Sequence, residues 1–241
     1  MNYDLHIHSC LSPCGDEDMT PNNIVNMAAL CGLDVIALCD HNSCGNCAAA
    51  IQVAAKNYPD MMVLPGMELE TAEEVHVVCL FADLDDALAF EKSVKAARIP
   101  IENRPDIYGR QVLRDENDEI AGFEPQLLVT ATSISIDDVP ALVEKYNGAA
   151  IPAHVDRDSN SVLSNLGFLT PEMGFRTIEV SKKLFGQKRG EFLEKNRLMR
   201  YNVLLDSDAH YLEDIGSAGG TTDAVFSTKK QLIALLRTTG F

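Results

Sequence analysis

Short apolar runs alternate with amphipathic segments along almost the whole of this 241-residue chain. Short apolar runs are typical of buried strands, and apolar residues at helical spacing are typical of helices packed on a sheet. The pattern predicts main strands at residues 3–8, 34–39, 61–67, 75–81, 149–153, 177–180 and 202–205, and a strand-like segment at 224–227. It predicts helices at residues 21–31, 45–57, 85–97, 136–146 and 228–238. Repeated βα units of this kind indicate a single α/β domain over residues 1–241.

One segment, from residue 99 to about 132, interrupts this rhythm. Within it, apolar and polar residues alternate on both sides of the polar sequence Asp-Glu-Asn-Asp at 115–118. Alternation around a polar turn is typical of a β-hairpin. We therefore expect an insertion over one rim of the domain, and not a second domain.

Residues of metal-ligand type follow the ends of several predicted strands. The set comprises His6 and His8 after the first strand, His41 after the second, Glu68 after the third, His76 within the fourth, His154 after the fifth, and Asp208 and His210 after the seventh. Side chains gathered from so many strand ends suit a barrel, whose site collects at the C-terminal rim, whereas an open sheet usually builds its site at one switch point. With seven main strands, we expect a distorted (β/α)7 TIM-like barrel with a β-hairpin insertion.

All six histidines of the chain lie in such short motifs. His6 and His8 share one face of a strand because side chains alternate with a period of two, and Asp208 and His210 repeat that spacing. Glu68 ends a buried strand, where a carboxylate needs a cation or a strong donor. Two of these residues have an alternative explanation without a metal: Glu68 could form a salt bridge with Arg157, and Asp208 could cap a helix or turn. The joint pattern instead predicts a multinuclear metal site.

Composition narrows the class of partner. The formal net charge is 20 − 36 = −16, and no cluster of Lys and Arg offers a basic groove, so long nucleic acid is an unlikely ligand. The apolar runs are too short for a membrane span, and no secretion signal is visible, so we expect a cytoplasmic protein. Seven cysteines, an odd number, argue against a disulfide framework. The sequence predicts no oligomeric state.

The motifs DLHIHS, CDHN, GMELE with a following EVHV, PAHVDR and SDAH resemble, in order, those of the PHP superfamily (polymerase and histidinol phosphatase). The family includes histidinol phosphatase, small-molecule phosphoesterases and the PHP domains of bacterial replicative and X-family polymerases. The resemblance spans residues 4–210 without a polymerase segment, and implies a stand-alone PHP protein. It implies two or three divalent ions (Zn, Mn or Fe). Their ligand sets would be His6, His8, Glu68 and Asp208; Glu68, His76 and His154; and His41, His210 and a residue of the loop after His8.

That loop departs from the usual family pattern, because it reads SPCGDED. Asp16 is the expected third ligand by its chemistry, with Cys14 and Asp18 as the alternatives. Two further residues are candidates for catalysis. Arg157 follows His154 closely enough to bind a phosphoryl oxygen, although it is also explained as a surface or ion-pairing residue. Asp40 precedes His41, and either orients a ligand, handles a proton or forms a turn.

The resemblance implies a hydrolase that acts on phosphate ester bonds. The substrate expected from these observations is a small phosphorylated metabolite or nucleotide, attacked by metal-activated water. The alternatives are a 3′–5′ exonuclease or oligonucleotide phosphodiesterase, an amide hydrolase, and a non-catalytic metal-binding scaffold.

Overall fold

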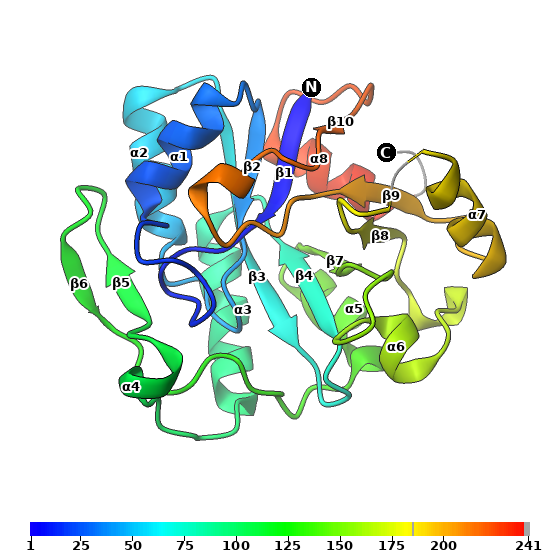
Figure 1. The fold of residues 1–241 in the computed structure, drawn as a ribbon, viewed down its shortest axis with the longest axis horizontal. Coiled ribbons are helices and arrows are strands. Elements are labelled where there is room, and N and C mark those ends of the chain that lie inside the picture. Colours follow the sequence, from blue (N-terminus) through cyan, green and yellow to red (C-terminus); the bar gives the residue numbers. More distant parts are fainter. Residues whose placement is uncertain (185, 239–241) are drawn as a thin grey trace.

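The computed structural model describes residues 1–184 and 186–238, and most of its β-structure is one curled sheet (Figure 1). The strand order is β10-β1-β2-β3-β4-β7. A separate parallel pair joins β8 to β9, and an antiparallel hairpin joins β5 to β6. The bounds are β1 (Asn2–Ile7), β2 (Val35–Leu38), β3 (Met62–Glu70), β4 (His76–Leu80), β5 (Val112–Arg114), β6 (Ile120–Phe123), β7 (Ala149–Pro152), β8 (Thr177–Val180), β9 (Asn202–Leu205) and β10 (Gly220–Thr221).

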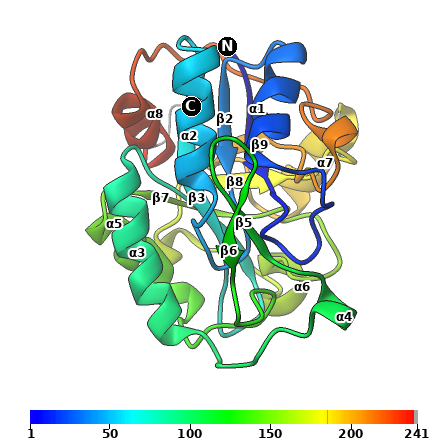
Figure 2. The same ribbon diagram turned by 90° about the vertical axis from the view of Figure 1, so that its left-hand side faces the viewer.

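The helices cover the sheet from several sides (Figures 1 and 2). They are α1 (Pro21–Leu30), α2 (Cys47–Asn57), α3 (Leu84–Ala97), α4 (Pro105–Tyr108), α5 (Val139–Lys145), α6 (Val162–Leu166), α7 (Gln187–Lys195) and α8 (Lys229–Leu236), with short 3-10 turns at Ile136–Asp138, Pro171–Met173 and Leu212–Asp214. Thr20 caps α1 by accepting a hydrogen bond from the backbone N–H of Asn23 (3.3 Å). The predicted strand at 224–227 is wrong, because this segment has no strand structure.

The α/β class is confirmed, but the closed (β/α)7 barrel is not. β1, β2 and β3 are parallel, whereas β4 runs antiparallel to both β3 and β7. A few backbone hydrogen bonds connect the β8–β9 region to the ends of β7 and β1 in the larger sheet. Val155 N–H donates to the Glu179 carbonyl (2.9 Å), and His8 N–H donates to the Ala209 carbonyl (3.0 Å). These contacts curl the two sheets around a common inner face without a continuous ladder between them.

Two apolar clusters fill the two faces of the sheet. The outer cluster packs α1, α2, α3 and α5 against the strands, and the inner cluster includes Leu64, Val78 and Leu80 with residues of α8. Because side chains alternate along a strand, the register that places Leu64 and Val78 in the inner cluster also directs Glu68 and His76 to the inner face. Glu68 and His76 therefore lie on the inner face of the curled sheet.

The predicted hairpin insertion is confirmed and lies against the loop that follows β1. Figure 2 shows β5 and β6 in front of the larger sheet. Val112 N–H donates to the Cys10 carbonyl (3.0 Å), and Asn46 Nδ2 donates to the Val112 carbonyl (3.1 Å). The insertion therefore supports the segment that carries the histidine pair.

No helix among the described residues is both long and apolar enough to cross a membrane.

Candidate metal centre

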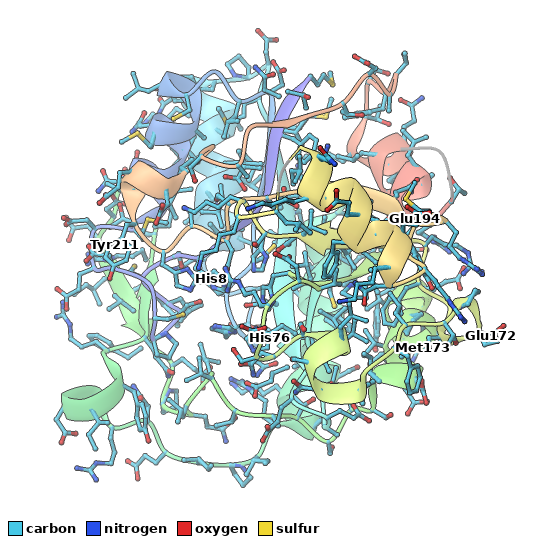
Figure 3. All side chains as sticks on the ribbon, turned by 45° about the vertical axis from the view of Figure 1, so that its right-hand side comes forward. His8, His76, Glu172, Met173, Glu194 and Tyr211 are labelled. Atoms are coloured by element: carbon cyan, nitrogen blue, oxygen red, sulfur yellow. The ribbon has the colours of Figure 1, made fainter. Side chains whose placement is uncertain are left out.

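Five of the six histidines converge on the carboxylate of Glu68. His8 follows β1 and His76 begins β4, yet both lie near the middle of the molecule in Figure 3. Five histidines place a ring nitrogen close to a Glu68 oxygen, at distances of 3.4 Å for His6, 3.3 Å for His8, 3.2 Å for His41, 2.9 Å for His76 and 3.2 Å for His154. The Glu68 side chain is 1% exposed. Gly66 permits this arrangement, because a Cβ there would lie 2.8 Å from Cys39 Sγ.

The first set of candidate ligands is the predicted one: His6, His8, Glu68 and Asp208. His6 Nε2 and His8 Nε2 are 3.2 Å apart, and His8 Nε2 is 3.0 Å from Asp208 Oδ1. Each of the four residues offers one ligand atom, and these atoms lie within 4.8 Å of one another. The arrangement matches what one divalent ion requires of a mixed imidazole and carboxylate site.

The other ring nitrogen of each histidine in this pair is linked to a buried carboxylate, directly for His6 and through Ser12 for His8. His6 Nδ1 lies 2.7 Å from Glu179 Oε2. His8 Nδ1 lies 3.0 Å from the Ser12 hydroxyl, which itself donates to Asp40 Oδ1 (2.6 Å). A proton held on each Nδ1 leaves Nε2 as the ring nitrogen that can bind an ion.

A second set surrounds the other side of Glu68. His76 Nδ1 and His154 Nε2 both approach Glu68 Oε1, and His41 approaches Oε2. The resemblance implied Glu68, His76 and His154 for the second ion, and the structure brings these three together. It also groups His41 with Glu68 and His76. Glu68 can therefore bridge two ions, as the shared carboxylate of a multinuclear site does.

The third set contains Cys14 and not Asp16. Ligand atoms of His8, Cys14, His41 and His210 lie within 4.8 Å of one another. Asp16 belongs to none of the candidate groups among the described residues, because its Oδ1 accepts a hydrogen bond from the Asp18 backbone N–H (2.9 Å) in a local turn. The Asp16 backbone N–H donates to the His210 carbonyl (2.9 Å). Asp16 as the third-site ligand stays a prediction, and its alternative Cys14 is the loop residue that the structure groups with the histidines.

Two candidate ligands adopt backbone conformations that are uncommon for residues with a side chain. His154 has φ = 31° and Asp208 has φ = 50°. Left-handed backbone of this kind is disfavoured outside glycine and persists where the surrounding structure holds it, often at functional sites. Here each residue turns the chain sharply after a strand, so that its side chain faces Glu68 and not the solvent.

Opposite charges dominate the electrostatics of the cluster. Burial disfavours every charged form, but Glu179, Glu68 and Asp208 outweigh it and raise the pKa of His6 well above its ordinary value. The same balance raises the pKa of His8 to about 9. Although burial opposes it, the neighbouring histidines hold the pKa of Glu68 well below its usual range. The cluster therefore stabilises anionic carboxylates at the centre.

The residues present fit divalent ions on two further grounds. Asp208 Oδ1 and His41 Nδ1 are buried close to His8 Nε2 and Glu68 Oε2, respectively, but neither forms a well-aligned hydrogen bond. Buried polar atoms are normally satisfied, because leaving them unpaired is costly. Imidazole and carboxylate donors together suit Zn²⁺, Mn²⁺ or Fe²⁺.

A family model for the PHP domain matches residues 4–154, which is more than half of the chain. The chain belongs to the PHP domain family. Asp208 and His210 lie beyond the matched segment, and it is the fold that returns them to the other PHP motifs. Comparison with curated protein sequences found no match.

Solved structures of low sequence identity share this PHP fold. One is a protein assigned as a metal-dependent phosphoesterase from Bifidobacterium adolescentis, with a TM-score of 0.61, 19% identity, and coverage of 99% of this chain and 96% of that one. Another is the lesion-specific endonuclease Q from Pyrococcus furiosus, with a TM-score of 0.63, 18% identity, and coverage of 89% of this chain but 50% of that one. A third is an amidohydrolase from Chromobacterium violaceum, with a TM-score of 0.58, 23% identity, and coverage of 90% of both chains.

The two predicted catalytic residues occupy different places in the PHP site. Arg157 Nη2 lies 2.6 Å from Asp208 Oδ2, and its side chain is 43% exposed, so it borders both the centre and the solvent. Asp40 is buried and accepts hydrogen bonds from the backbone and hydroxyl groups of Ser9 and Ser12. Of the roles that the sequence left open for Asp40, the structure favours orienting a ligand, because Asp40 acts on His8 through Ser12.

Glu179 is the residue that the motifs missed. It lies in β8, is buried, and contacts His6 Nδ1 as well as the His154 backbone N–H (3.2 Å). A glutamate inside the apolar run TIEV carries the same signal that identified Glu68, namely a carboxylate in a buried strand.

Replacing Glu179 by glutamine is expected to weaken metal binding by about 10- to 100-fold, the usual effect of removing a carboxylate behind a ligating histidine. Metal affinity is measured by competition with a chromogenic chelator. Asp156→Asn is the matched control, because Asp156 accepts hydrogen bonds from Ser181 and contacts no candidate ligand in these bonds. Equal affinities for both variants would contradict a positioning role for Glu179.

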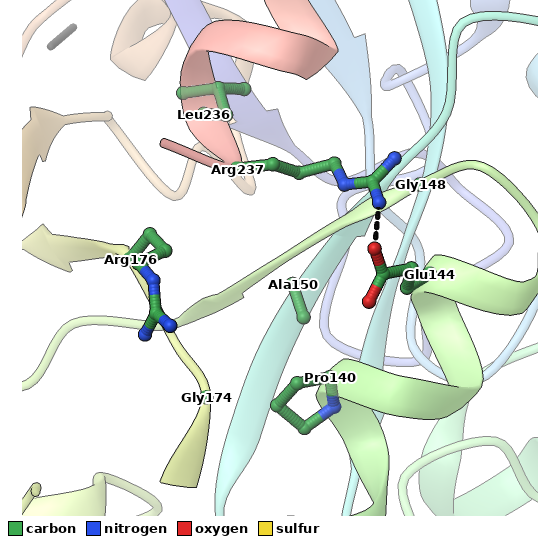
Figure 4. A pocket seen from close by; sticks show the side chains of 8 residues that line it. All are labelled: Pro140, Glu144, Gly148, Ala150, Gly174, Arg176, Leu236 and Arg237. Carbon is green, nitrogen blue, oxygen red and sulfur yellow. Dashed lines mark hydrogen bonds and ion pairs between the residues drawn. The ribbon is translucent and has the colours of Figure 1, made fainter. Parts of the chain in front are cut away.

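A separate pocket lies at the opposite end of β7 from His154 (Figure 4). Its volume is about 190 Å³, and Glu144 and Arg237 form an ion pair across it. The lining residues are Pro140, Glu144, Gly148, Ala150, Gly174, Arg176, Leu236 and Arg237. None of them is a candidate metal ligand, so this pocket is not part of the PHP centre.

Proposed function

We propose that this protein is a metal-dependent phosphoesterase that hydrolyses a small phosphorylated metabolite or nucleotide. The observation that carries the proposal is the Glu68 carboxylate with ring nitrogens of five histidines around it. When bound, two or three divalent ions would neutralise a phosphate ester and lower the pKa of a water molecule for attack on phosphorus. His6, His8, Glu68 and Asp208 would hold one ion. Glu68, His76 and His154 would hold a second.

The protein groups have separate tasks in this proposal. Glu179 and Asp40 hold the protons of the His6 and His8 rings away from the centre. Arg157 is half-exposed beside Asp208 and can offer its guanidinium to a phosphoryl oxygen, a pairing that favours arginine over lysine. Cytosolic metabolites with a terminal phosphate present that group without a long polyanionic backbone.

The charge of the chain supports a small substrate over nucleic acid. At −16, the protein repels a long phosphate backbone. The match to endonuclease Q covers 50% of the length of that protein, so half of endonuclease Q lies outside the region that matches this chain. A non-catalytic scaffold is disfavoured, because the full set of six histidines reaches the centre.

The proposal is tested by elemental analysis of the purified protein together with a hydrolysis screen with and without added Mn²⁺. The screen contains phosphate monoesters, a dinucleotide, a short oligonucleotide and an amide. Bound metal with release of phosphate from small monoesters would support the proposal. Cleavage of the oligonucleotide or the amide alone would replace it with that activity, and a protein that neither contains nor binds metal would refute it.

Replacing Arg157 by alanine is expected to raise KM for the phosphate ester, and to weaken inhibition by inorganic phosphate, by about tenfold or more. Arg157→Lys, which keeps the charge but loses the planar fork, should give an intermediate value. Steady-state kinetics and phosphate inhibition measure both effects. If the melting temperature of Arg157→Ala changes but KM and phosphate inhibition do not, Arg157 serves only to pair with Asp208 and does not bind the substrate.

A further inference from the structure

The third candidate set differs in chemistry from the other two, because it contains sulfur and no carboxylate. Its members are His8, Cys14, His41 and His210. Glu68 and Asp208 provide oxygen ligands to the other sets, whereas the non-imidazole donor here is a thiol. The position therefore offers a softer ligand environment than the rest of the centre.

The ring nitrogens can be assigned within this set. His210 Nδ1 donates to the Asp208 carbonyl (2.8 Å), so His210 Nε2 is left to act as a ligand. His8 has Nδ1 engaged with Ser12, and its Nε2 faces His6 and Asp208, so His8 belongs to the first ion. His41 is buried, and its Nδ1 lies 3.2 Å from Glu68 Oε2 without forming a well-aligned hydrogen bond. Cys14, His41 and His210 therefore remain as the ligands for an ion of their own.

The loop that carries Cys14 is held close to the centre by backbone contacts. Gly15 N–H donates to the Ser12 carbonyl (2.9 Å), and Asp16 N–H donates to the His210 carbonyl (2.9 Å). A Cβ at Gly15 would lie 2.3 Å from the Ser9 carbonyl oxygen, so a residue with a side chain cannot occupy this turn without moving the backbone. This turn places Cys14 over the histidines and leaves Asp16 in its local turn.

We propose that the Cys14 thiolate is a ligand of the third ion and makes this position selective for Zn²⁺, Fe²⁺ or Co²⁺ over Mn²⁺ and Mg²⁺. The inference rests on the proposed metal-dependent function and adds a chemical asymmetry to it. A coordinated thiol loses its proton, and a thiolate prefers the softer ions, whereas carboxylates suit Mn²⁺ and Mg²⁺. The complete centre therefore binds ions of two kinds: a softer ion at the position that contains Cys14, and ions at the two positions that contain carboxylates.

The test is a Co²⁺ titration of the full-length protein, read by metal stoichiometry and by the thiolate-to-cobalt charge-transfer absorption in the near ultraviolet. Cys14→Ser should bind about one ion fewer and lose the absorption. Cys31→Ser is the matched control, because Cys31 is the other exposed thiol and its sulfur donates to the Ile215 carbonyl, away from the candidate ligand sets of the described residues. Cys14→Asp should recover the third ion with Mn²⁺ but not the absorption.

Alkylation supplies a second readout within the unmodified protein. Cys14 and Cys31 are both exposed, and the other cysteines are buried. Zn²⁺ should slow the reaction of Cys14 with iodoacetamide by roughly tenfold or more, because a coordinated sulfur is no longer a free nucleophile, and should leave Cys31 unaffected. Peptide mass spectrometry distinguishes the two sites.

The two proposals fail in different ways. If Cys14→Ser keeps the absorption and the stoichiometry, or if Zn²⁺ does not protect Cys14, the thiolate ligand is refuted even where phosphate esters are hydrolysed. If the absorption depends on Cys14 but no phosphate ester is hydrolysed, the ligand assignment stands and the proposed activity falls.

Discussion

Replacing Glu68 by glutamine is expected to lower hydrolysis by about three orders of magnitude or more and to release at least one ion. Glu68 belongs to two of the candidate metal sets, and ring nitrogens of five histidines lie within 3.4 Å of its oxygens. Glutamine keeps the size of the side chain, but it offers one oxygen and no negative charge. It therefore cannot bridge two ions as a carboxylate does. Metal content and steady-state rates measure the two effects.

Glu124→Gln is the control for this variant, since Glu124 is also a buried carboxylate and pairs with Arg98 (3.6 Å) in the insertion, outside the candidate ligand sets. It should keep its metal and its rate. Circular dichroism and a cooperative unfolding transition establish that Glu68→Gln still folds. A folded Glu68→Gln variant with unchanged metal content would contradict the bridging assignment.

Most of the centre could be predicted from the sequence, because its ligands lie in short motifs at strand ends. His6 and His8 follow from the period of a strand, and Glu68 follows from the cost of burying an unpaired carboxylate. The antiparallel direction of β4 could also have been predicted from the sequence. Only residues 71–75 separate β3 from β4, and a parallel connection needs about a dozen residues or more. The gathering of ligand residues at many strand ends, together with the count of seven strands, favoured a barrel and left that limit out of account.

The placement of Cys14 and Glu179 depends on contacts that sequence spacing does not encode. The sequence favoured Asp16 by its chemistry and left Cys14 and Asp18 as alternatives, whereas the close packing of Gly15 against Ser9 shapes a loop in which Cys14 lies near the histidines. Glu179 has no histidine beside it in the chain. It reaches His6 only because β8 lies next to the ends of β7 and β1 in the folded protein.

In the metal-free protein, the free energy of unfolding is expected to fall as pH rises through the alkaline range. The pKa of His8 rises from its ordinary value of 6.5 to about 9 in the folded metal-free protein. The folded state therefore binds more protons than the unfolded state between these values, and the free energy of unfolding falls as pH rises through this window. The stabilisation by protonated His8 is fully present below pH 6.5 and lost above about pH 9.

In the metal-loaded protein the same histidine must be neutral to act as a ligand, so binding releases the proton. Metal affinity should then rise by about tenfold per pH unit for each displaced proton between pH 6.5 and about 9, and the stability added by saturating metal should rise with it. Urea unfolding at several pH values, with Mn²⁺ and with a chelator, measures both curves. Glu124→Gln should reproduce the divergence, because it leaves the centre intact. Parallel curves with and without metal would show that His8 is neutral in both states and that no ion displaces its proton.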